Sequence, residues 1–402
     1  MSTTPRNPLA HLTQELATLR SNGTYFELRI LEDEQAAVCV YDGKRVINLA
    51  SNNYLGFANH PKLREAAIAA VRKYGVGSGA VRTIAGTMRI HMELEEKIAR
   101  FKDVEACVVF QSGFAANAGT VSSVLGREDF IISDELNHAS IIDGARLSRA
   151  KIKVFRHKDV AHAEELLQEV QNEPGRKLII TDGVFSMDGD IGPVDRLCAL
   201  AEKYEAIMMV DDAHASGVLG RNGRGSVDHF HCHGKVDIQV GTLSKAIGAL
   251  GGYVCGSRDL IDYLRHRARP FLFSTSHPPS VAATCIAAFD LLEQEPERIE
   301  RLWDNTRYLK KGFEAAGFDV GGRTTPASES PITPIIIGDS AKTMEFSRRL
   351  FDVGVMATGI VFPTVPEGKA RIRTIVTSEH TQGQMDEALD KFVRVGKEMS
   401  IL

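Results

Sequence analysis

The chain alternates short apolar segments with amphipathic stretches through its first 290 residues. We expect a strand at each of five apolar segments, at residues 130–132, 178–180, 207–210, 238–240 and 253–255. Between several of them apolar residues recur at the spacing of a helix, as in residues 161–170 and 194–204. Short strands separated by helices predict an α/β fold whose sheet is mainly parallel and buried.

The same pattern divides the chain into parts. A first clear helix is predicted at residues 61–74, between Pro61 and Gly75, which are typical of a helix start and stop. Beyond about residue 290 the pattern becomes that of a smaller α+β unit, with helices expected near residues 296–316, 341–353 and 381–399 and a strand at 332–337. We therefore predict an N-terminal segment at residues 1–55, a large domain at 56–290 and a small C-terminal domain at 291–402.

Composition and charge exclude several classes of protein. The 402 residues are 43% hydrophobic and 25% charged, which is typical of a globular protein and not of a disordered one. Lys and Arg number 48 against 52 Asp and Glu, so no basic field predicts a nucleic-acid partner. No apolar run is long enough to span a membrane and no apolar leader opens the sequence, so we expect a cytoplasmic protein. The six cysteines form no CxxC pair and are expected to be reduced core residues.

Polar residues directly after predicted strands are the candidates for chemistry, because open α/β sheets bind ligands at the carboxyl ends of their strands. Lys245 follows the strand at 238–240 and lies among small residues. A buried lysine loses its charge readily, which is what imine formation with an aldehyde requires. A lone lysine is otherwise a solvated surface group, so both interpretations stand at this point.

Asp211 and His214 follow the strand at 207–210. A carboxylate there can pair with the protonated pyridine nitrogen of a pyridoxal ring, and His214 can bond to the phenolic oxygen of that ring. Asp211, Asp212 and His214 are also possible metal ligands by residue type. Since the sequence has no HExxH or CxxC motif, we favour the pyridoxal interpretation and expect no metal.

Two further patterns suggest anion sites. Residues 111–117 follow an apolar segment and precede a helical pattern, so their amides predict a phosphate site at a helix N-terminus, although an ordinary strand-to-helix turn fits equally well. Residues 75–80 match a dinucleotide-binding glycine pattern, but they follow a helix and therefore fail its context. Arg371 and Arg373 share one face of a predicted strand, a suitable fork for a substrate carboxylate if they are not simply surface charge.

Six motifs in order resemble the α-oxoamine synthase family of fold-type I enzymes that depend on pyridoxal 5′-phosphate (PLP). The motifs are residues 51–56, 136–140, 184–189, 211–214, 242–245 and 273–276, and the resemblance covers nearly the whole chain. It implies a large PLP-binding domain with a mainly parallel sheet, a small C-terminal α+β domain, and a homodimer with composite active sites.

The resemblance also implies roles for individual residues. Lys245 would bind PLP as an imine and later take the Cα proton, Asp211 would hold the pyridinium nitrogen, and His138 would stack on the ring, with His214 and Ser186 near its phenolic oxygen. Ser112, Gly113, Phe114 and Thr242 would hold the phosphate, with Ser274 and Thr275 reaching the phosphate of the neighbouring subunit. Arg373 would bind the amino-acid carboxylate, with Arg371 as the alternative. Other expected substrate contacts are Arg29, Asn52, Asn53, Val81, Arg82 and Thr364.

The implied reaction is a Claisen-type condensation of a small amino acid with an acyl-CoA. The sequence around Val81 and Arg82 resembles the glycine C-acetyltransferase branch, and an apolar Val81 suits a short acyl chain. We therefore expect glycine and acetyl-CoA to give 2-amino-3-oxobutyrate and CoA, in threonine and glycine metabolism. Residues 361–366 resemble the biotin-synthesis branch as much as the acetyltransferase branch. The biotin-synthesis branch, 8-amino-7-oxononanoate synthase, joins alanine and pimeloyl-CoA with decarboxylation. That activity, or a relaxed acyl specificity, remains the alternative.

Overall fold

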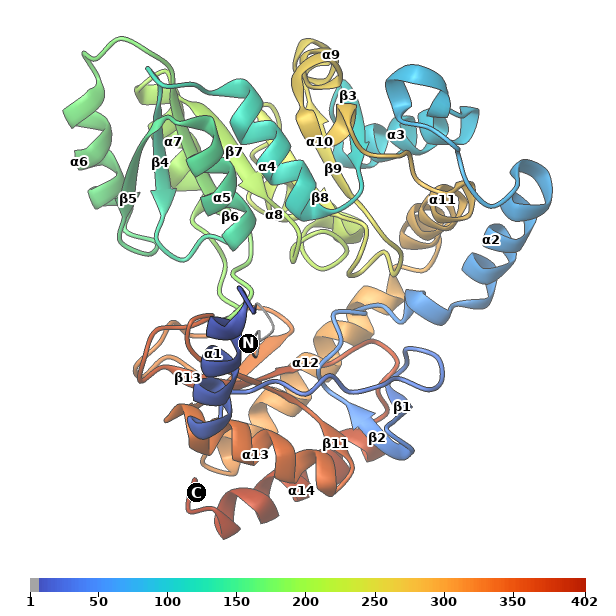
Figure 1. Ribbon diagram of the computed structural model, residues 1–402, viewed down its shortest axis with the longest axis vertical. Coiled ribbons are helices and arrows are strands. Elements are labelled where there is room, and N and C mark those ends of the chain that lie inside the picture. The colour runs from blue at the N-terminus through green and yellow to red at the C-terminus, as the bar shows by residue number, and fades with distance from the viewer. Residues whose placement is uncertain (1–6) are drawn as a thin grey trace, which may run out of the picture.

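A seven-stranded sheet forms the centre of the larger part of the molecule in the computed structural model, which describes residues 7–402 (Figure 1). Its strands are β3 (Ala106–Phe110), β4 (Phe130–Asp134), β5 (Lys151–Phe155), β6 (Lys177–Asp182), β7 (Ile207–Asp211), β8 (Ile238–Thr242) and β9 (Gly252–Gly256). Their order is β3-β9-β8-β7-β6-β4-β5, and all neighbours are parallel except that β9 runs antiparallel to both β3 and β8. The five predicted strands are all present, and the sheet is mainly parallel as predicted.

Alternation along the strands sends side chains to two helical layers, because successive residues of a strand point to opposite faces. Met209 packs in one core with α4 (Gly113–Val124), α5 (Ala139–Ser148), α9 (Arg258–Arg267) and α10 (Arg269–Leu272). Met208 packs on the other face with α6 (Val160–Val170) and α7 (Val194–Lys203). The edge strand β5 instead exposes most of its residues, including Lys151, which discourages pairing with another sheet.

A third core lies at the β3 side of the sheet and continues into the smaller part of the molecule. Its helices in the larger part are α2 (Pro61–Tyr74), α3 (Arg89–Lys102) and α11 (Pro279–Gln294). The short elements η1 (Phe57–Asn59), η2 (Arg82–Gly86), η3 (Arg221–Gly223) and α8 (Ser226–His229) complete this part.

The smaller part contains a three-stranded antiparallel sheet in the order β10-β13-β12. The strands are β10 (Ile332–Gly338), β12 (Thr358–Ile360) and β13 (Ala370–Ile375), and the helices are α12 (Glu297–Ala315), α13 (Ser340–Asp352) and α14 (Gln382–Glu398). Four phenylalanine rings, of Phe313, Phe318, Phe346 and Phe392, pack against one another in its core.

Part of the N-terminal segment belongs to this smaller part. Strands β1 (Val38–Tyr41) and β2 (Lys44–Asn48) pair with each other, and β2 also pairs in parallel with β11 (Val355–Met356). The described part of the predicted N-terminal segment, residues 7–55, therefore joins the smaller part through β1 and β2, and the positions of the domain boundaries stay a prediction.

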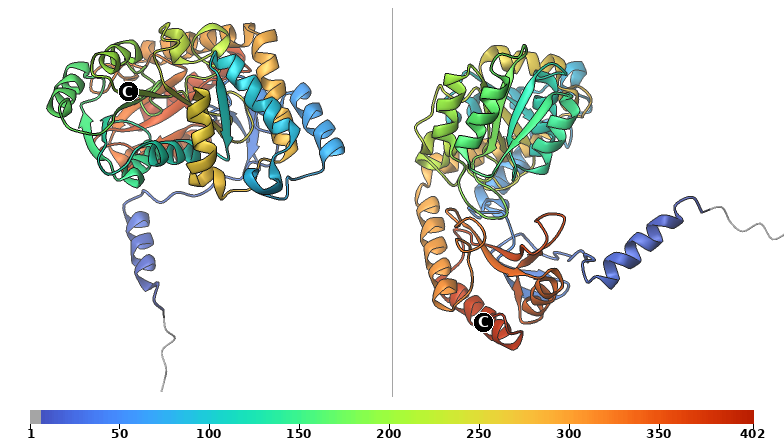
Figure 2. Two further views of the ribbon diagram at one scale, coloured as in Figure 1. Left: turned by 90° about the horizontal axis from the view of Figure 1, so that it is seen from above. Right: turned by 90° about the vertical axis from the view of Figure 1, so that its left-hand side faces the viewer.

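Helix α1 (Ala10–Ser21) projects away from the rest of the chain (Figure 2). All 12 of its residues are exposed, including several leucines. None of the helices in residues 7–402 combines the length and the apolar character that a membrane span requires. The six cysteines are buried and unpaired, as predicted from their surroundings.

Candidate active site

The carboxyl ends of β6, β7 and β8 and the N-termini of α4 and α5 enclose a cavity of about 140 Å³. Its lining residues are Gly113, Phe114, Asn117, His138, Ser140, Asp182, Ser186, Asp211, Ala213, His214, Thr242 and Lys245. Eight of these are candidates from the sequence: Gly113, Phe114, His138, Ser186, Asp211, His214, Thr242 and Lys245. The structure thus gathers eight of the eleven proposed cofactor residues, which lie far apart in the sequence, around one cavity.

Lys245 lies in the turn that follows β8. Its backbone carbonyl accepts a hydrogen bond from the Gly248 amide, and the preceding Thr242 hydroxyl donates to the Gly251 carbonyl, so the turn is fixed on both sides of the lysine. Burial lowers the pKa of Lys245 to about 8, against the opposing effect of Asp211 and Asp182. Roughly a tenth of this amine is therefore uncharged at pH 7, far more than for an ordinary lysine, and able to react with an aldehyde.

Asp211 ends β7 and faces the cavity with its carboxylate held in place. It accepts hydrogen bonds from Asn117 Nδ2 at 2.6 Å and from the Ala213 amide at 2.8 Å. The neighbouring Asp182 accepts from the His138 amide at 2.9 Å, and burial, together with the charge of Asp211, raises the pKa of Asp182. The fixed Asp211 carboxylate is suited to a protonated ring nitrogen inside the cavity.

Two histidines of the cavity are kept neutral. Burial lowers the pKa of His138, whose Nδ1 lies 2.7 Å from Ser140 Oγ. Burial also lowers the pKa of His214, with the charges of Lys245 and Arg373 acting in the same direction. The His214 ring is oriented by Tyr54, whose hydroxyl lies 2.8 Å from Nδ1. Neutral rings of this kind can stack on an aromatic ligand or bond to its oxygen without a desolvation cost for a charge.

The N-terminus of α4 provides a site for an anion. Ser112 caps the helix by accepting a hydrogen bond from the Ala115 amide at 3.0 Å. The N–H groups of the first helical turn have no partner within the helix, so those of Gly113 and Phe114 are available to a ligand. Gly113 lies beside Thr242, and a Cβ atom on it would be 3.4 Å from the Thr242 Cβ, in ordinary van der Waals contact.

The chemical groups around the cavity match those of PLP. The helix N-terminus suits its phosphate, the Asp211 carboxylate suits its ring nitrogen, and the partly uncharged Lys245 suits its aldehyde.

The two arginines of β13 have different surroundings. Arg373 donates from Nη1 to the Ser186 carbonyl at 3.2 Å, and burial lowers its pKa. Arg371 pairs with Asp188 at 2.5 Å and donates to the Met187 carbonyl at 3.1 Å, with only 3% of its side chain exposed. Since Arg371 already has a carboxylate partner, Arg373 is the arginine with capacity for a substrate carboxylate.

Other sequence candidates lie outside the cavity lining. Arg29 pairs with Asp42 at 3.1 Å and lies over the Phe351 ring of the smaller part. Asn53 is buried and donates to the Gln35 carbonyl. The remaining candidates outside the lining are Ser112, which caps α4, Asn52, which is half-buried, Thr364, which is exposed, and Ser274 and Thr275.

Val81 and Arg82, the basis of the expected acyl specificity, are engaged within the fold. Val81 forms a backbone bridge with Thr275. Arg82 is 5% exposed and pairs with Glu95 at 2.8 Å, and Glu95 also pairs with Arg265 at 2.9 Å. A buried guanidinium with a carboxylate partner contributes to packing in this part of the fold and says little about the acyl chain.

Sequence reasoning assigned no role to Asn117, Ser140 and Asp182, although all three line the cavity. Asn117 lies one helical turn beyond Gly113, so helical spacing placed it on the same face of α4 as the phosphate site. Asp182 follows the apolar part of β6 as Asp211 follows that of β7, and the paired strands bring them side by side.

A buried ion pair holds the turn after β7 in place. The Asp212 carboxylate lies 2.9 Å from Lys102 Nζ, and neither side chain is exposed. Lys102 also donates to Ser216 Oγ and to the Arg224 carbonyl, while Asp212 accepts from the Ser226 amide. The pair therefore fixes the segment that carries Asp211 and His214.

Substitution of this lysine, Lys102→Met, is expected to lower the free energy of unfolding by about 3–5 kcal/mol, because it leaves the buried Asp212 carboxylate without its cation. Urea denaturation of the two proteins measures this difference. Lys153→Met is the matched control, since Lys153 pairs with Glu169 at the surface and its loss is expected to cost about 1 kcal/mol or less. Equal losses in the two variants would contradict the structural role of the buried pair.

Comparisons with known proteins place the chain in a family. The family model for aminotransferases of class I and II matches residues 44–392. The 8-amino-7-oxononanoate synthase of Symbiobacterium thermophilum is 57% identical over 391 residues, which are 97% of this chain and 98% of the relative. The 8-amino-7-oxononanoate synthase 1 of Bacillus subtilis is 55% identical over the same shares of the two chains.

Solved structures agree with this placement. Serine palmitoyltransferase from S. paucimobilis, solved with PLP bound, superimposes with a TM-score of 0.93 and 32% identity over 99% of this chain and all of its own. The 8-amino-7-oxononanoate synthase of Francisella tularensis gives a TM-score of 0.72 and 28% identity over 88% of this chain and 98% of its own. The predicted fold type I and the predicted cofactor PLP are thereby confirmed.

The comparisons also correct the expected reaction. Relatives that are 53–57% identical over nearly the full length are named 8-amino-7-oxononanoate synthase, so the prediction of glycine C-acetyltransferase activity in threonine metabolism is wrong. The prediction rested in part on residues 81 and 82, whose contacts lie within the fold. The cofactor and the acyltransferase chemistry are unaffected by this correction. The chain belongs to the α-oxoamine synthase family of PLP-dependent enzymes, within the aminotransferases of class I and II.

Proposed function

We propose that the protein condenses L-alanine with pimeloyl-CoA to form 8-amino-7-oxononanoate, CoA and CO₂, a step of biotin synthesis. The observation that carries this proposal is the identity of 53–57% to relatives of that name over nearly the whole chain. The likeness to serine palmitoyltransferase supports the shared chemistry of an amino acid and an acyl thioester, but at 32% identity it is a weaker guide to the substrate.

The residues of the cavity have complementary roles in this reaction. When bound, PLP supplies an electron-withdrawing ring that stabilises negative charge at the Cα of the amino acid. Lys245, with its pKa near 8, accepts the proton from Cα, since a base whose pKa lies close to the working pH transfers protons efficiently. Asp211 would hold the ring nitrogen, and the α4 amides would hold the phosphate beside Thr242.

Arg373 binds the amino-acid carboxylate and so orients Cα. Its side chain is half-buried and uses Nη1 to reach the Ser186 carbonyl, which leaves other N–H groups of the fork for a substrate. His138 is positioned for stacking on the ring by its contact with Ser140, and His214 for contact with the phenolic oxygen by its contact with Tyr54.

We also propose that two copies of the chain form a homodimer. Helix α1 exposes Leu12, Leu16 and Leu19 and buries none of its residues in its own chain, so it needs a partner surface to be stable. Thr275 lies outside the cavity of its own chain, in agreement with a role toward the phosphate of a neighbouring subunit. Sedimentation equilibrium is expected to give twice the chain mass of 44.0 kDa, and a mass of one chain would contradict the dimer.

The substrate pair is tested by release of CoA from the purified holoenzyme. We expect a higher kcat/KM with L-alanine and pimeloyl-CoA than with glycine and acetyl-CoA, by roughly 100-fold or more, because additional buried methylenes each contribute about 0.8 kcal/mol of binding. The two crossed pairs, alanine with acetyl-CoA and glycine with pimeloyl-CoA, show which substrate carries the preference. Preference for glycine and acetyl-CoA would overturn the proposal.

A further inference from the structure

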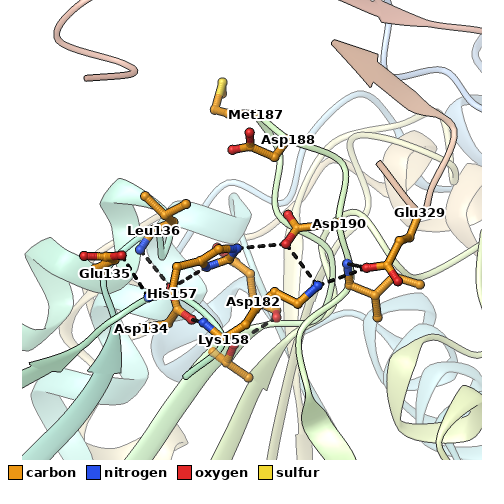
Figure 3. Close-up of polar contacts among 12 residues, drawn as sticks. Asp134, Glu135, Leu136, His157, Lys158, Asp182, Met187, Asp188, Asp190 and Glu329 are labelled. Atoms are coloured by element: carbon orange, nitrogen blue, oxygen red, sulfur yellow. Dashed lines mark hydrogen bonds and ion pairs between the residues drawn. The ribbon is translucent and has the colours of Figure 1, made fainter. Parts of the chain in front are cut away.

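A network of charged side chains surrounds the loop at residues 183–190, which connects β6 to the segment before α7 (Figure 3). On the side of the larger part, Asp190 lies 2.8 Å from His157 Nε2 and 3.2 Å from Lys158 Nζ. On the side of the smaller part, Asp188 pairs with Arg371, and Glu329 pairs with Lys158 at 3.0 Å. The loop is thus held between the two parts of the molecule.

His157 is at the centre of this network. Its Nδ1 lies 2.9 Å from Asp134 Oδ1 and its Nε2 lies 2.8 Å from Asp190 Oδ2, so the ring bridges two buried carboxylates. Only 10% of the histidine side chain is exposed, while both carboxylates are fully covered. Both ring nitrogens can donate at once only in the imidazolium form, and the two carboxylates raise the pKa of His157 to about 9 against the effect of burial.

The backbone around His157 is built to hold this position. The His157 amide donates to Glu135 Oε1 at 2.8 Å, and the Lys158 amide donates to Asp134 Oδ2 at 2.9 Å. Lys158 has a φ of +58°, in the left-handed region that residues with a Cβ seldom adopt. The His157 ring and the Lys158 amide both contact the Asp134 carboxylate, and these contacts hold the turn in its strained conformation.

Two short paths lead from His157 to the substrate side of the loop. The His157 ring packs edge-on against the Phe185 ring, with centroids 4.4 Å apart. The Phe185 amide also donates to the backbone carbonyl of Asp190 at 3.0 Å. The next residue is Ser186, whose carbonyl accepts the 3.2 Å hydrogen bond from Arg373. Displacement of Asp190 or Phe185 would therefore move the carbonyl that orients Arg373.

We propose that His157 is a positioning residue for the amino-acid substrate: its imidazolium fixes the loop whose Ser186 carbonyl sets the orientation of Arg373. This inference rests on the proposed role of Arg373 in binding the substrate carboxylate. His157 does not line the cavity, so it acts on the substrate only through the loop.

The groups around His157 are mostly negative and therefore favour its positively charged form. Asp134 from β4 and Asp190 from the loop contact the ring directly, and Glu135 accepts a hydrogen bond from the His157 amide. The opposing cation is Lys158, which is shared between Asp190 and Glu329. A neutral side chain at residue 157 removes the positive charge between the two buried carboxylates. Lys158 then remains as the cation that contacts Asp190, so Asp190 is held less firmly.

The test is the dissociation constant for L-alanine, measured with the PLP-loaded enzyme from the change in cofactor absorbance and without any acyl-CoA. His157→Gln is expected to raise this constant roughly tenfold. The constant for ethylamine, which has the amine but lacks the carboxylate, is expected to stay within about twofold, and so is the absorbance spectrum of the unliganded enzyme. Equal weakening of both ligands would overturn the inference, because it would indicate a general disturbance of the site.

A double-mutant cycle with Arg373→Ala separates this inference from the proposed function. If His157 acts through Arg373, the effect of His157→Gln on alanine disappears in the Arg373→Ala background, and a persistent effect would overturn the inference alone. If Arg373→Ala by itself leaves alanine binding unchanged, the proposed carboxylate site fails and the inference fails with it. The exposed His266 supplies the matched control, since His266→Gln is expected to change neither ligand.

Lys158→Gln provides the milder variant in case His157→Gln does not fold. It removes one cation from Asp190 but keeps the His157 bridge. We expect a loss of roughly two- to threefold for alanine and none for ethylamine. The same loss for the two ligands would contradict the positioning role.

Discussion

Replacement of Lys245 by alanine is expected to abolish the borohydride-reducible link between the chain and PLP and to lower kcat roughly 10⁴-fold. The half-buried Lys245, with a pKa of about 8, is the only lysine that lines the cavity among the described residues, so the variant loses both the covalent attachment and the base for the Cα proton. The absorbance band near ~420 nm that lysine-bound PLP gives is expected to disappear. Absorbance spectra and peptide mapping after borohydride reduction measure the two effects.

The other proposed PLP contacts predict how this variant behaves. The α4 amides, Asp211 and the two histidines do not depend on the lysine, so the variant is expected to bind PLP reversibly and to lose it on dialysis. Lys235→Ala, at an exposed position, is the control and is expected to match the unaltered protein. A variant that lacks Lys245 and still yields a peptide with reduced PLP attached would contradict the assignment.

Replacement of Arg373 by alanine is expected to weaken L-alanine binding by about 2–4 kcal/mol, or roughly 30- to 1,000-fold, with little effect on the acyl-CoA. The side chain is half-buried, so a carboxylate bound to the guanidinium is only partly screened by water, and the variant removes its charge and its fork together. Binding is measured by titrating the holoenzyme with alanine, and the KM for pimeloyl-CoA is measured separately.

Two neighbouring variants control this result. Arg373→Lys keeps the charge but loses the planar fork, so an intermediate loss is expected. Arg371→Ala removes the partner of Asp188 and is expected to destabilise the fold more than it changes the affinity for alanine. A loss confined to the acyl-CoA in Arg373→Ala would place the carboxylate site elsewhere.

The fold was largely predictable from the sequence because its signal is local. The apolar segments that became β6, β7 and β8 are bounded by polar residues, and the helix at Pro61–Tyr74 has its start and stop signals in the sequence. The reversal of β9 was not visible, because a buried antiparallel strand has the same apolar pattern as a parallel one. The pairing of β2 with β11 joins residues about 300 positions apart, and no local pattern specifies it.

Site residues were predictable where they follow the end of a strand. They were less predictable where their role depends on a contact with a residue distant in the sequence. Asp211 directly follows an apolar segment, Lys245 and His214 lie a few residues after one, and all three line one cavity. The partner of His214 is Tyr54, 160 residues earlier, and only the fold brings the two together. Arg82 shows the opposite case, since a basic residue near a family motif suggested a substrate contact, whereas Glu95, one helix later, is its partner.

The proposed decarboxylating condensation is tested by the reaction of pimeloyl-CoA with L-alanine that carries ¹³C at its carboxyl carbon. We expect each CoA released to be accompanied by one labelled CO₂ and one unlabelled 8-amino-7-oxononanoate, and we expect both to stop in the Lys245→Ala variant. Absence of reaction with this pair, or a condensation product that retains the labelled carboxylate, would contradict the proposed function.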